Sequence, residues 1–122
     1  MIWKFDPNNN VLLFTFTLGG HPEDIAITST NVAYVAAGDD GGDPGLVYRY
    51  DARTGEILNG PANPIEGIGR GASRIAIADD NSVYVSCTFV NRVDKIVGDM
   101  KVSSFDVGER PVSLAVYQNS EE

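Results

Sequence analysis

An internal repeat dominates this 122-residue sequence. One type of segment, which reads apolar, variable, basic, apolar, occurs at Ile2–Asp6, Val47–Asp51 and Val93–Val97. The interval from Ile2 to Val47 is 45 residues and that from Val47 to Val93 is 46 residues. Self-similarity at a fixed period is the signature of a repeat architecture, so the chain consists of units of this length.

Two further segment types recur in the same order along the chain. The pattern Gly-x5-[Ile/Leu]-Ala-[Ile/Val] spans residues 19–27, 69–77 and 108–116. The pattern Asn-x-[Ala/Val]-Tyr-Val-[Ala/Ser] spans residues 31–36 and 81–86. Agreement of three segment types in one order indicates a structural repeat rather than chance.

Each unit has the pattern of short β-strands. Runs of four to seven residues rich in Val, Ile, Tyr and Phe are bounded by turn sequences, of which Asp51 to Gly55 is one. No window has apolar residues at helical spacing, so no helix is predicted. We predict strands over residues 2–6, 11–17, 24–28, 32–37, 46–51, 56–59, 73–78, 82–87, 91–97, 100–106 and 112–117.

Four short antiparallel strands in each period of this length are typical of the blades of a β-propeller. We therefore predict an all-β fold, a partial β-propeller of four-stranded antiparallel blades. The chain forms one domain over residues 1–122 in this interpretation. It contains a half blade at 1–17, whole blades at 18–59 and 60–106, and the start of the next blade at 107–122.

The motifs of the second unit resemble a known repeat family. Val83-Tyr84-Val85-Ser86 is followed by Val93 to Ile96 and then by Val107-Gly108-Glu109-Arg110-Pro111-Val112-Ser113-Leu114-Ala115-Val116. This series resembles the YVTN family of propeller repeats and is similar to the NHL repeats. Ser86-Cys87 stands where that family has Thr-Asn. The resemblance covers nearly the whole chain and implies a propeller fold, but it says almost nothing about activity.

Two and a half blades cannot close a ring, since propellers typically have four to eight blades. Unpaired strand edges and bare apolar blade faces favour association. The predicted partners are therefore further propeller blades of a longer protein, another protein, or other copies of this chain in a homo-oligomer; a stable open wedge is the remaining alternative. The residues predicted to fill the core between blades are Ile25, Ile27, Tyr34, Val35, Val47, Tyr50, Ile75, Ile77, Tyr84, Val85, Val93, Ile96, Leu114 and Val116.

The charge balance argues against two classes of partner. Acidic side chains outnumber basic ones by 17 to 9, which gives a net charge of −8. Nucleic acids and anionic membrane surfaces are bound chiefly through clustered Lys and Arg, and no such cluster occurs here. The chain also has neither the pattern of a signal peptide nor an apolar run long enough to span a bilayer. Its compartment stays open, because a lone cysteine fits either redox environment.

Three carboxylates in one glycine-rich loop form the most conspicuous candidate site. Asp39, Asp40 and Asp43 lie within Gly38 to Gly45, and oxygen ligands of this kind bind hard divalent cations such as Ca²⁺. The spacing is not that of an EF-hand, so a solvated turn between two strands is the competing interpretation. A divalent cation is therefore the one cofactor that the sequence suggests.

The single histidine, His21, lies two residues from Glu23 and forms a second candidate for a metal ligand or general base. Its counterparts in the other units, Gly71 and Arg110, point instead to an ordinary loop position. Three arginines in equivalent loops suggest an anion-binding rim: Arg70, Arg74 and Arg110. Cys87 is predicted to be a small buried residue, and Trp3, Tyr48 and Tyr50 to pack within the blades.

Two functions follow from these features. The first is a non-catalytic binding or scaffold module, a piece of a larger propeller, with no catalytic residues. The alternative is a fragment of a propeller hydrolase or lyase, similar to gluconolactonases or streptogramin lyases, that uses a divalent cation. The candidate cation ligands of such a fragment are His21, Glu23, Asn91 and the Asp39 to Asp43 loop. A compartment for either function is not indicated.

Overall fold

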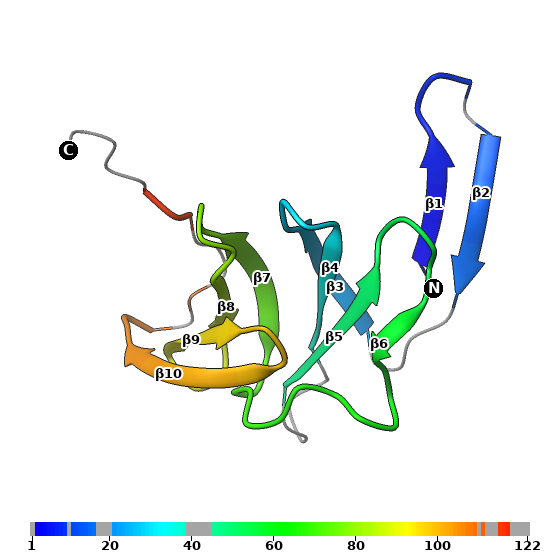
Figure 1. The fold of residues 1–122 in the computed structure, drawn as a ribbon. Coiled ribbons are helices and arrows are strands. Elements are labelled where there is room, and N and C mark those ends of the chain that lie inside the picture. The colour runs from blue at the N-terminus through cyan, green and yellow to red at the C-terminus, as the bar shows by residue number, and fades with distance from the viewer. Residues whose placement is uncertain are drawn as a thin grey trace.

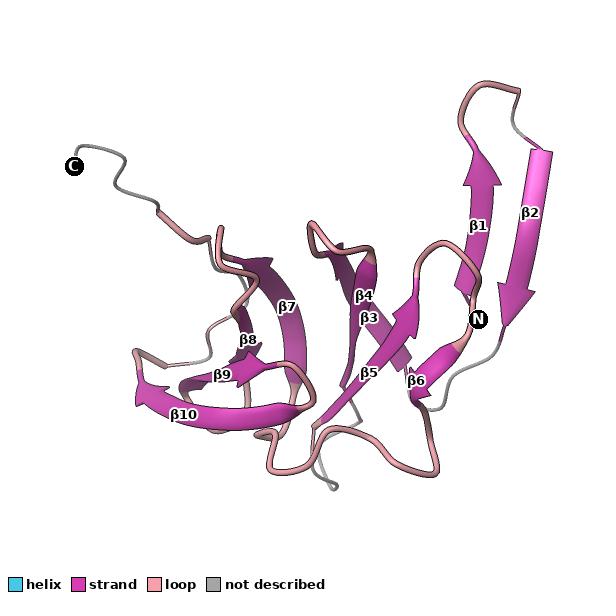
Figure 2. Cartoon of the chain, viewed as in Figure 1, coloured by secondary structure: helices cyan, strands magenta, loops and turns pink. Residues whose placement is uncertain are grey.

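The computed structural model describes residues 2–9, 11–16, 21–38, 45–109, 111 and 115–117. These residues form three antiparallel sheets and no helix (Figures 1 and 2). The N-terminal hairpin consists of β1 (Ile2–Asp6) and β2 (Val11–Phe16). Blade 1 consists of β3 (His21–Ile27), β4 (Val32–Gly38), β5 (Leu46–Asp51) and β6 (Ile57–Asn59). Blade 2 consists of β7 (Ala72–Ile77), β8 (Val83–Cys87), β9 (Arg92–Val97) and β10 (Met100–Asp106).

Both blades have their strands in sequence order, as an antiparallel meander. The two blades lie side by side, and the hairpin stands beyond blade 1, on the side away from blade 2 (Figure 1). Contacts between the blades join β3 and β4 to β7. The predicted all-β architecture of four-stranded antiparallel blades is therefore confirmed.

Most predicted strand ends agree with the structure to within one residue, with two exceptions. The strand predicted at 24–28 begins at His21 and ends at Ile27, because β3 pairs only with β4 and an edge strand accepts Pro22. The strand predicted at 112–117 was wrong for residues 115–117, which form none, while 112–114 lie outside the described residues. A strand needs a neighbour for its hydrogen-bond ladder, and no described strand pairs there.

The repeat extends to backbone irregularities. The β3–β4 register shifts between Pro22 and Asp24, and the β7–β8 register shifts between Ala72 and Arg74, which are the equivalent positions. Asn31 and Asn81 have positive φ angles of 65° and 66° in the turns that follow β3 and β7. Asparagine tolerates this left-handed conformation well, so the recurring Asn of the sequence pattern has a local structural cause.

The main hydrophobic core lies between the blades. One face of blade 1 supplies Tyr34, Ala36 and Val47, and the facing side of blade 2 supplies Ile75, Val83, Val85, Cys87 and Ile96. A second cluster lies on the other face of blade 1 and contains Ala33, Val35, Ala37, Tyr48 and Tyr50. The predicted place in the core between blades is thus confirmed for Tyr34, Val47, Ile75, Val85 and Ile96, whereas Val35 and Tyr50 are buried in the second cluster.

The core prediction was wrong for Ile25 and Ile27. Their side chains are 42% and 54% exposed, whereas Ile75, the counterpart of Ile25, is only 8% exposed. Ile75 is covered because it faces blade 1, and no described strand covers the corresponding inner part of blade 1. Tyr84, Val93, Ile77 and Val116 are half-buried, and Leu114 lies outside the described residues.

Polar groups also join the two blades. Asp24 Oδ2 of β3 accepts a hydrogen bond from the backbone N–H of Ile75 at 2.8 Å. Asn81 connects the two turns, since its Oδ1 accepts from the N–H of Ser29 at 3.1 Å and its Nδ2 donates to the Ser29 hydroxyl at 2.9 Å. Tyr34 Oη donates to the carbonyl of Gly98 at 2.7 Å. These bonds fix the register of one blade against the other.

Candidate functional site

The residues predicted to hold a cation are only partly described. Asp39, Asp40 and Asp43 lie outside the described residues. His21 opens β3, and nothing is described of its side chain. Glu23 is exposed at the β3 bulge, beside a shallow hollow of about 220 Å³ lined also by Pro22, Asp24, Ile25 and Val35. Within the described ranges no three His, Cys, Asp or Glu side chains gather in a way that could hold a metal ion.

The other sequence candidates are occupied in ordinary structural roles or lie outside the described part. The Arg74 guanidinium donates to the backbone carbonyls of Glu23 and Ser73, at 3.4 and 2.9 Å. Arg110 is not among the described residues. Asn91 has a positive φ of 55°, and its carbonyl accepts a hydrogen bond from the N–H of Val107. Arg70 is exposed in the loop before β7, and the anion rim expected from these arginines stays a prediction.

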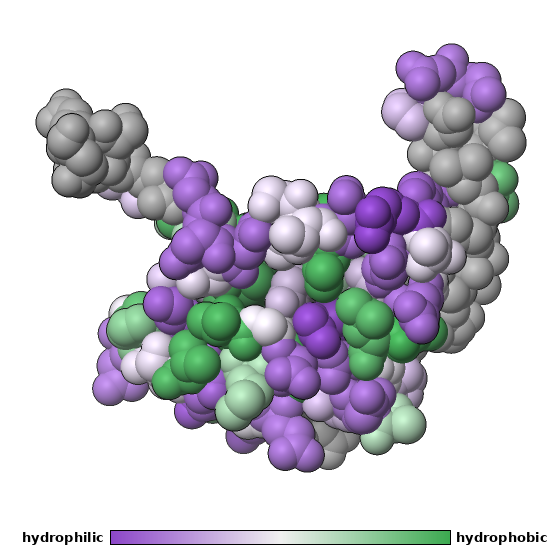
Figure 3. All heavy atoms as spheres, viewed as in Figure 1, coloured by the Kyte–Doolittle hydropathy of each residue, from purple (hydrophilic) through white to green (hydrophobic). Residues whose placement is uncertain are grey.

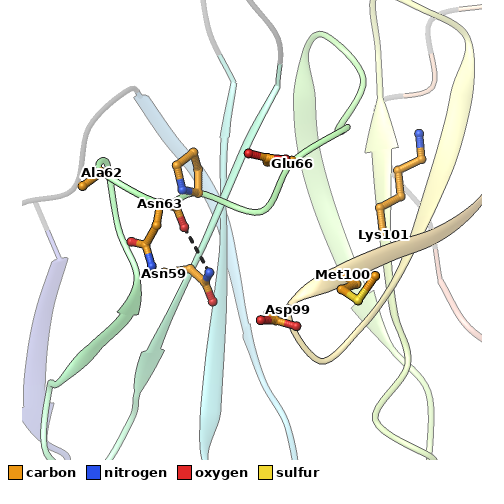
Figure 4. A pocket seen from close by; sticks show the side chains of 8 residues that line it. Asn59, Ala62, Asn63, Glu66, Asp99, Met100 and Lys101 are labelled. Carbon is orange, nitrogen blue, oxygen red and sulfur yellow. Dashed lines mark hydrogen bonds between the residues drawn. The ribbon is translucent and has the colours of Figure 1, made fainter.

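A groove lies between the two blades, on the side of their connecting loop (Figure 4). It has a volume of about 510 Å³ and runs between the connecting loop and the turn from β9 to β10. Its lining is mostly polar: Asn59, Ala62, Asn63, Pro64, Glu66, Asp99, Met100 and Lys101. Asn59 Nδ2 donates to the Asn63 carbonyl at 3.0 Å, so one wall is held by the loop's own hydrogen bonds.

A fully buried carboxylate, Asp94, lies at the contact between blade 2 and the connecting loop. Arg92 Nε and the Ser104 hydroxyl donate to its Oδ1 at 2.8 and 2.7 Å. The Gly69 N–H donates to its Oδ2 at 2.7 Å, and Lys101 Nζ lies 3.8 Å from Oδ1. A buried carboxylate is tolerated only with such partners, so Asp94 ties the loop to the blade.

The same network sets the ionisation of two groups. Burial alone would raise the pKa of Asp94, but the hydrogen bonds from Arg92, Ser104 and Gly69 outweigh it and hold the pKa below its ordinary value. Burial and the neighbouring Asp94 charge raise the pKa of the Cys87 thiol to about 12. Cys87 is therefore a neutral thiol at physiological pH, 3.4 Å from Asp94 Oδ2, and its predicted buried role is confirmed.

Close backbone approaches fix the connecting loop against both blades. A Cβ atom on Gly45 would lie 2.0 Å from the carbonyl oxygen of Gly69. A Cβ on Gly69 would lie 2.7 Å from Val90 Cγ2 and 2.9 Å from Cys87 Cβ. Only glycine permits these distances, so the conspicuous Gly69 serves loop packing. Ile65 of the same loop donates its N–H to the carbonyl of Val47 at 3.0 Å.

Sequence reasoning missed the role of Asp94. One signal was present, because the repeat places Asp94 at the position occupied by Trp3 and Tyr48 in the other units. Tyr48 is buried, so a carboxylate at the matching position demands buried partners. The identity of those partners, Gly69 above all, depends on the path of the connecting loop and has no sequence pattern.

Comparison with known proteins adds information on the fold. No protein-family model matches the sequence, and a search of the curated proteins finds no significant match. Among solved structures the chain is similar to a chain of Kuenenia stuttgartiensis hydrazine synthase, a β-propeller-containing protein, with a TM-score of 0.67 and 14% sequence identity. The similarity covers 87% of this chain and 29% of that chain.

At this identity the likeness shows the fold alone. Together with the two four-stranded sheets it establishes an all-β chain with the architecture of a partial β-propeller. Nothing about activity follows, since one fold supports many functions. No helix in the described part of the chain is long and apolar enough to cross a membrane.

Proposed function

We propose that this chain is a non-catalytic binding or scaffold module of the YVTN/NHL repeat type, a piece of a larger propeller. Its role in this proposal is to present blade surfaces to further blades or to a protein partner. The rigid interblade contacts supply the framework, and the surface loops supply the variable part. The step from fold to role rests on the described surface and on the analogy with those repeats.

The observation that carries the proposal is the exposure of Ile25 and Ile27. Their counterparts in blade 2 are Ile75 and Ile77, which pack into the core between the two blades. Two large aliphatic side chains in a row on one strand face are costly to leave in water, at about 25 cal/mol per Å² of apolar surface. This surface therefore has the composition of a blade contact rather than of a solvated face.

Titration with divalent cations separates this proposal from the hydrolase or lyase alternative. We expect no heat of binding with Ca²⁺, Mg²⁺ or Mn²⁺ in calorimetry, and no hydrolysis of a panel of small lactones above the buffer rate. A stoichiometric cation that also supports lactone hydrolysis would overturn the proposal. Glu23→Gln is the control variant, because loss of both signals in it would assign the activity to the predicted ligands.

A further inference from the structure

The carbonyl that follows the third strand of each blade accepts a hydrogen bond from the unit before it. In blade 2 this carbonyl belongs to Gly98, and Tyr34 Oη of blade 1 donates to it at 2.7 Å. In blade 1 it belongs to Ala52, and Lys4 Nζ of the N-terminal hairpin donates to it at 2.5 Å. The repeat alignment places the corresponding carbonyl of the hairpin at Pro7, in the β1–β2 turn.

The donor that would match this third acceptor is Tyr84 of blade 2. Tyr84 is the repeat counterpart of Tyr34, and each ring has a cation above it: Arg49 at 5.9 Å from Tyr34 and Lys95 at 5.7 Å from Tyr84. Arg49 and Lys95 are themselves counterparts in the repeat, so the two rings have matching cation–π neighbours. Within the described residues, the Tyr84 hydroxyl has no hydrogen-bond partner.

Tyr84 belongs to an incompletely covered face of blade 2, which we call the Tyr84 face. Cross-strand pairing places its members on one side of the sheet: Ala76, Tyr84, Ser86, Val93, Lys95 and Phe105. Phe105 is 47% exposed and tilts against Tyr84, with 6.5 Å between the ring centroids. The counterpart face of blade 1 is buried at Tyr34 and Val47 by blade 2. Apolar side chains are visible at the surface where β9 and β10 lie (Figure 3).

The N-terminal hairpin is the matching half of this contact. It forms a two-stranded sheet within the described residues, and such a sheet is marginal unless other elements pack on it. In the repeat, its two strands correspond to β9 and β10 of blade 2. The turn between β9 and β10 contains Gly98, whose carbonyl accepts the hydrogen bond from Tyr34. Pro7 is exposed in the turn, so its surroundings leave room for a partner.

We propose that the Tyr84 face of blade 2 docks the N-terminal hairpin of a second copy of this chain, with Tyr84 Oη donating to the Pro7 carbonyl. In this arrangement Tyr84 and Pro7 of two copies would repeat the contact that Tyr34 and Gly98 make between blades 1 and 2 of one chain. Each copy carries one face and one hairpin, so two copies satisfy both contacts in a closed pair. The inference deepens the proposed function by naming its partner, and it rests on that function only for the role of blade surfaces as docking surfaces.

Sedimentation equilibrium over a concentration series that reaches the millimolar range tests this docking. We expect a concentration-dependent dimer for the natural chain and a monomer for Phe105→Glu, which places a charge on the Tyr84 face. Ile57→Glu is the matched control, because Ile57 is 42% exposed, much as Phe105 is, but pairs with Tyr50 on the edge strand of blade 1, away from the Tyr84 face. Circular dichroism must show the same β-sheet spectrum for all three proteins.

Tyr84→Phe keeps the ring and removes only the hydroxyl, so we expect it to weaken the dimer about two- to ten-fold, the usual effect of one hydrogen bond. A natural chain that stays monomeric throughout the series would overturn the proposal, and so would a dimer that Phe105→Glu leaves intact. Neither result bears on the cation and lactone measurements, so the two proposals fail separately.

Discussion

Asp94→Asn is expected to lower the free energy of unfolding by about 3 kcal/mol at neutral pH, since it removes one partner of a buried ion pair. The variant leaves Arg92 without its carboxylate and turns an amide towards the Gly69 N–H, which needs an acceptor. Urea denaturation at fixed ionic strength measures the loss. Asp99→Asn is the control, because Asp99 lies exposed at the groove, and we expect no resolvable change for it.

The loss should depend on pH in one direction. The pKa of Asp94 is lower in the folded chain than its ordinary value of 3.8, so its stabilising effect is fully present above that value. It disappears as the pH falls through the folded-state pKa, where the natural carboxylate becomes neutral. The difference between the natural chain and the variant should therefore be constant from pH 7 to about pH 5 and shrink below 3.8. A difference that grows on acidification would contradict this assignment.

Ile75→Ala is expected to cost about 2–4 kcal/mol of unfolding free energy, because its side chain fills the core between the blades. The repeat supplies a matched control in Ile25→Ala. Ile25 occupies the same position in blade 1 but is 42% exposed, so its truncation should cost about 1 kcal/mol or less. Equal losses, measured by urea denaturation of dilute samples, would contradict the difference in burial between Ile75 of blade 2 and Ile25 of blade 1.

The sequence predicted the repeat, the strands and most of the core because each has a local cause. The turn at Asp51 to Gly55 is an example: Gly55 has a φ of 81° and donates to the Asp51 carbonyl at 2.8 Å, as the turn composition indicates. Tyr48 is buried within blade 1, as its place in the repeat predicts. Alternating strand residues pack on opposite faces, so these positions can be assigned before any neighbour is known.

The features that were mispredicted or missed depend on neighbours distant in sequence. Ile25 and Ile75 match in pattern, but their exposure differs because only one of them faces a complete blade. Asp94 accepts a hydrogen bond from the Gly69 N–H, and Gly69 lies 25 residues away in a loop that has no repeat pattern. The Asp39 to Asp43 loop and the side chain of His21 lie outside the described part of the chain, so the cation site stays a prediction.

Blade 1 packs against blade 2 in a fixed register, and hydrogen exchange at the Ile75 amide tests this packing directly. That N–H donates to Asp24 Oδ2 across the blades at 2.8 Å. We predict slow exchange in the natural chain and at least a ten-fold faster rate in Asp24→Ala, with the β8–β9 amides unchanged. Fast exchange at Ile75 in the natural chain, or equal protection in Asp24→Ala, would contradict the interblade register.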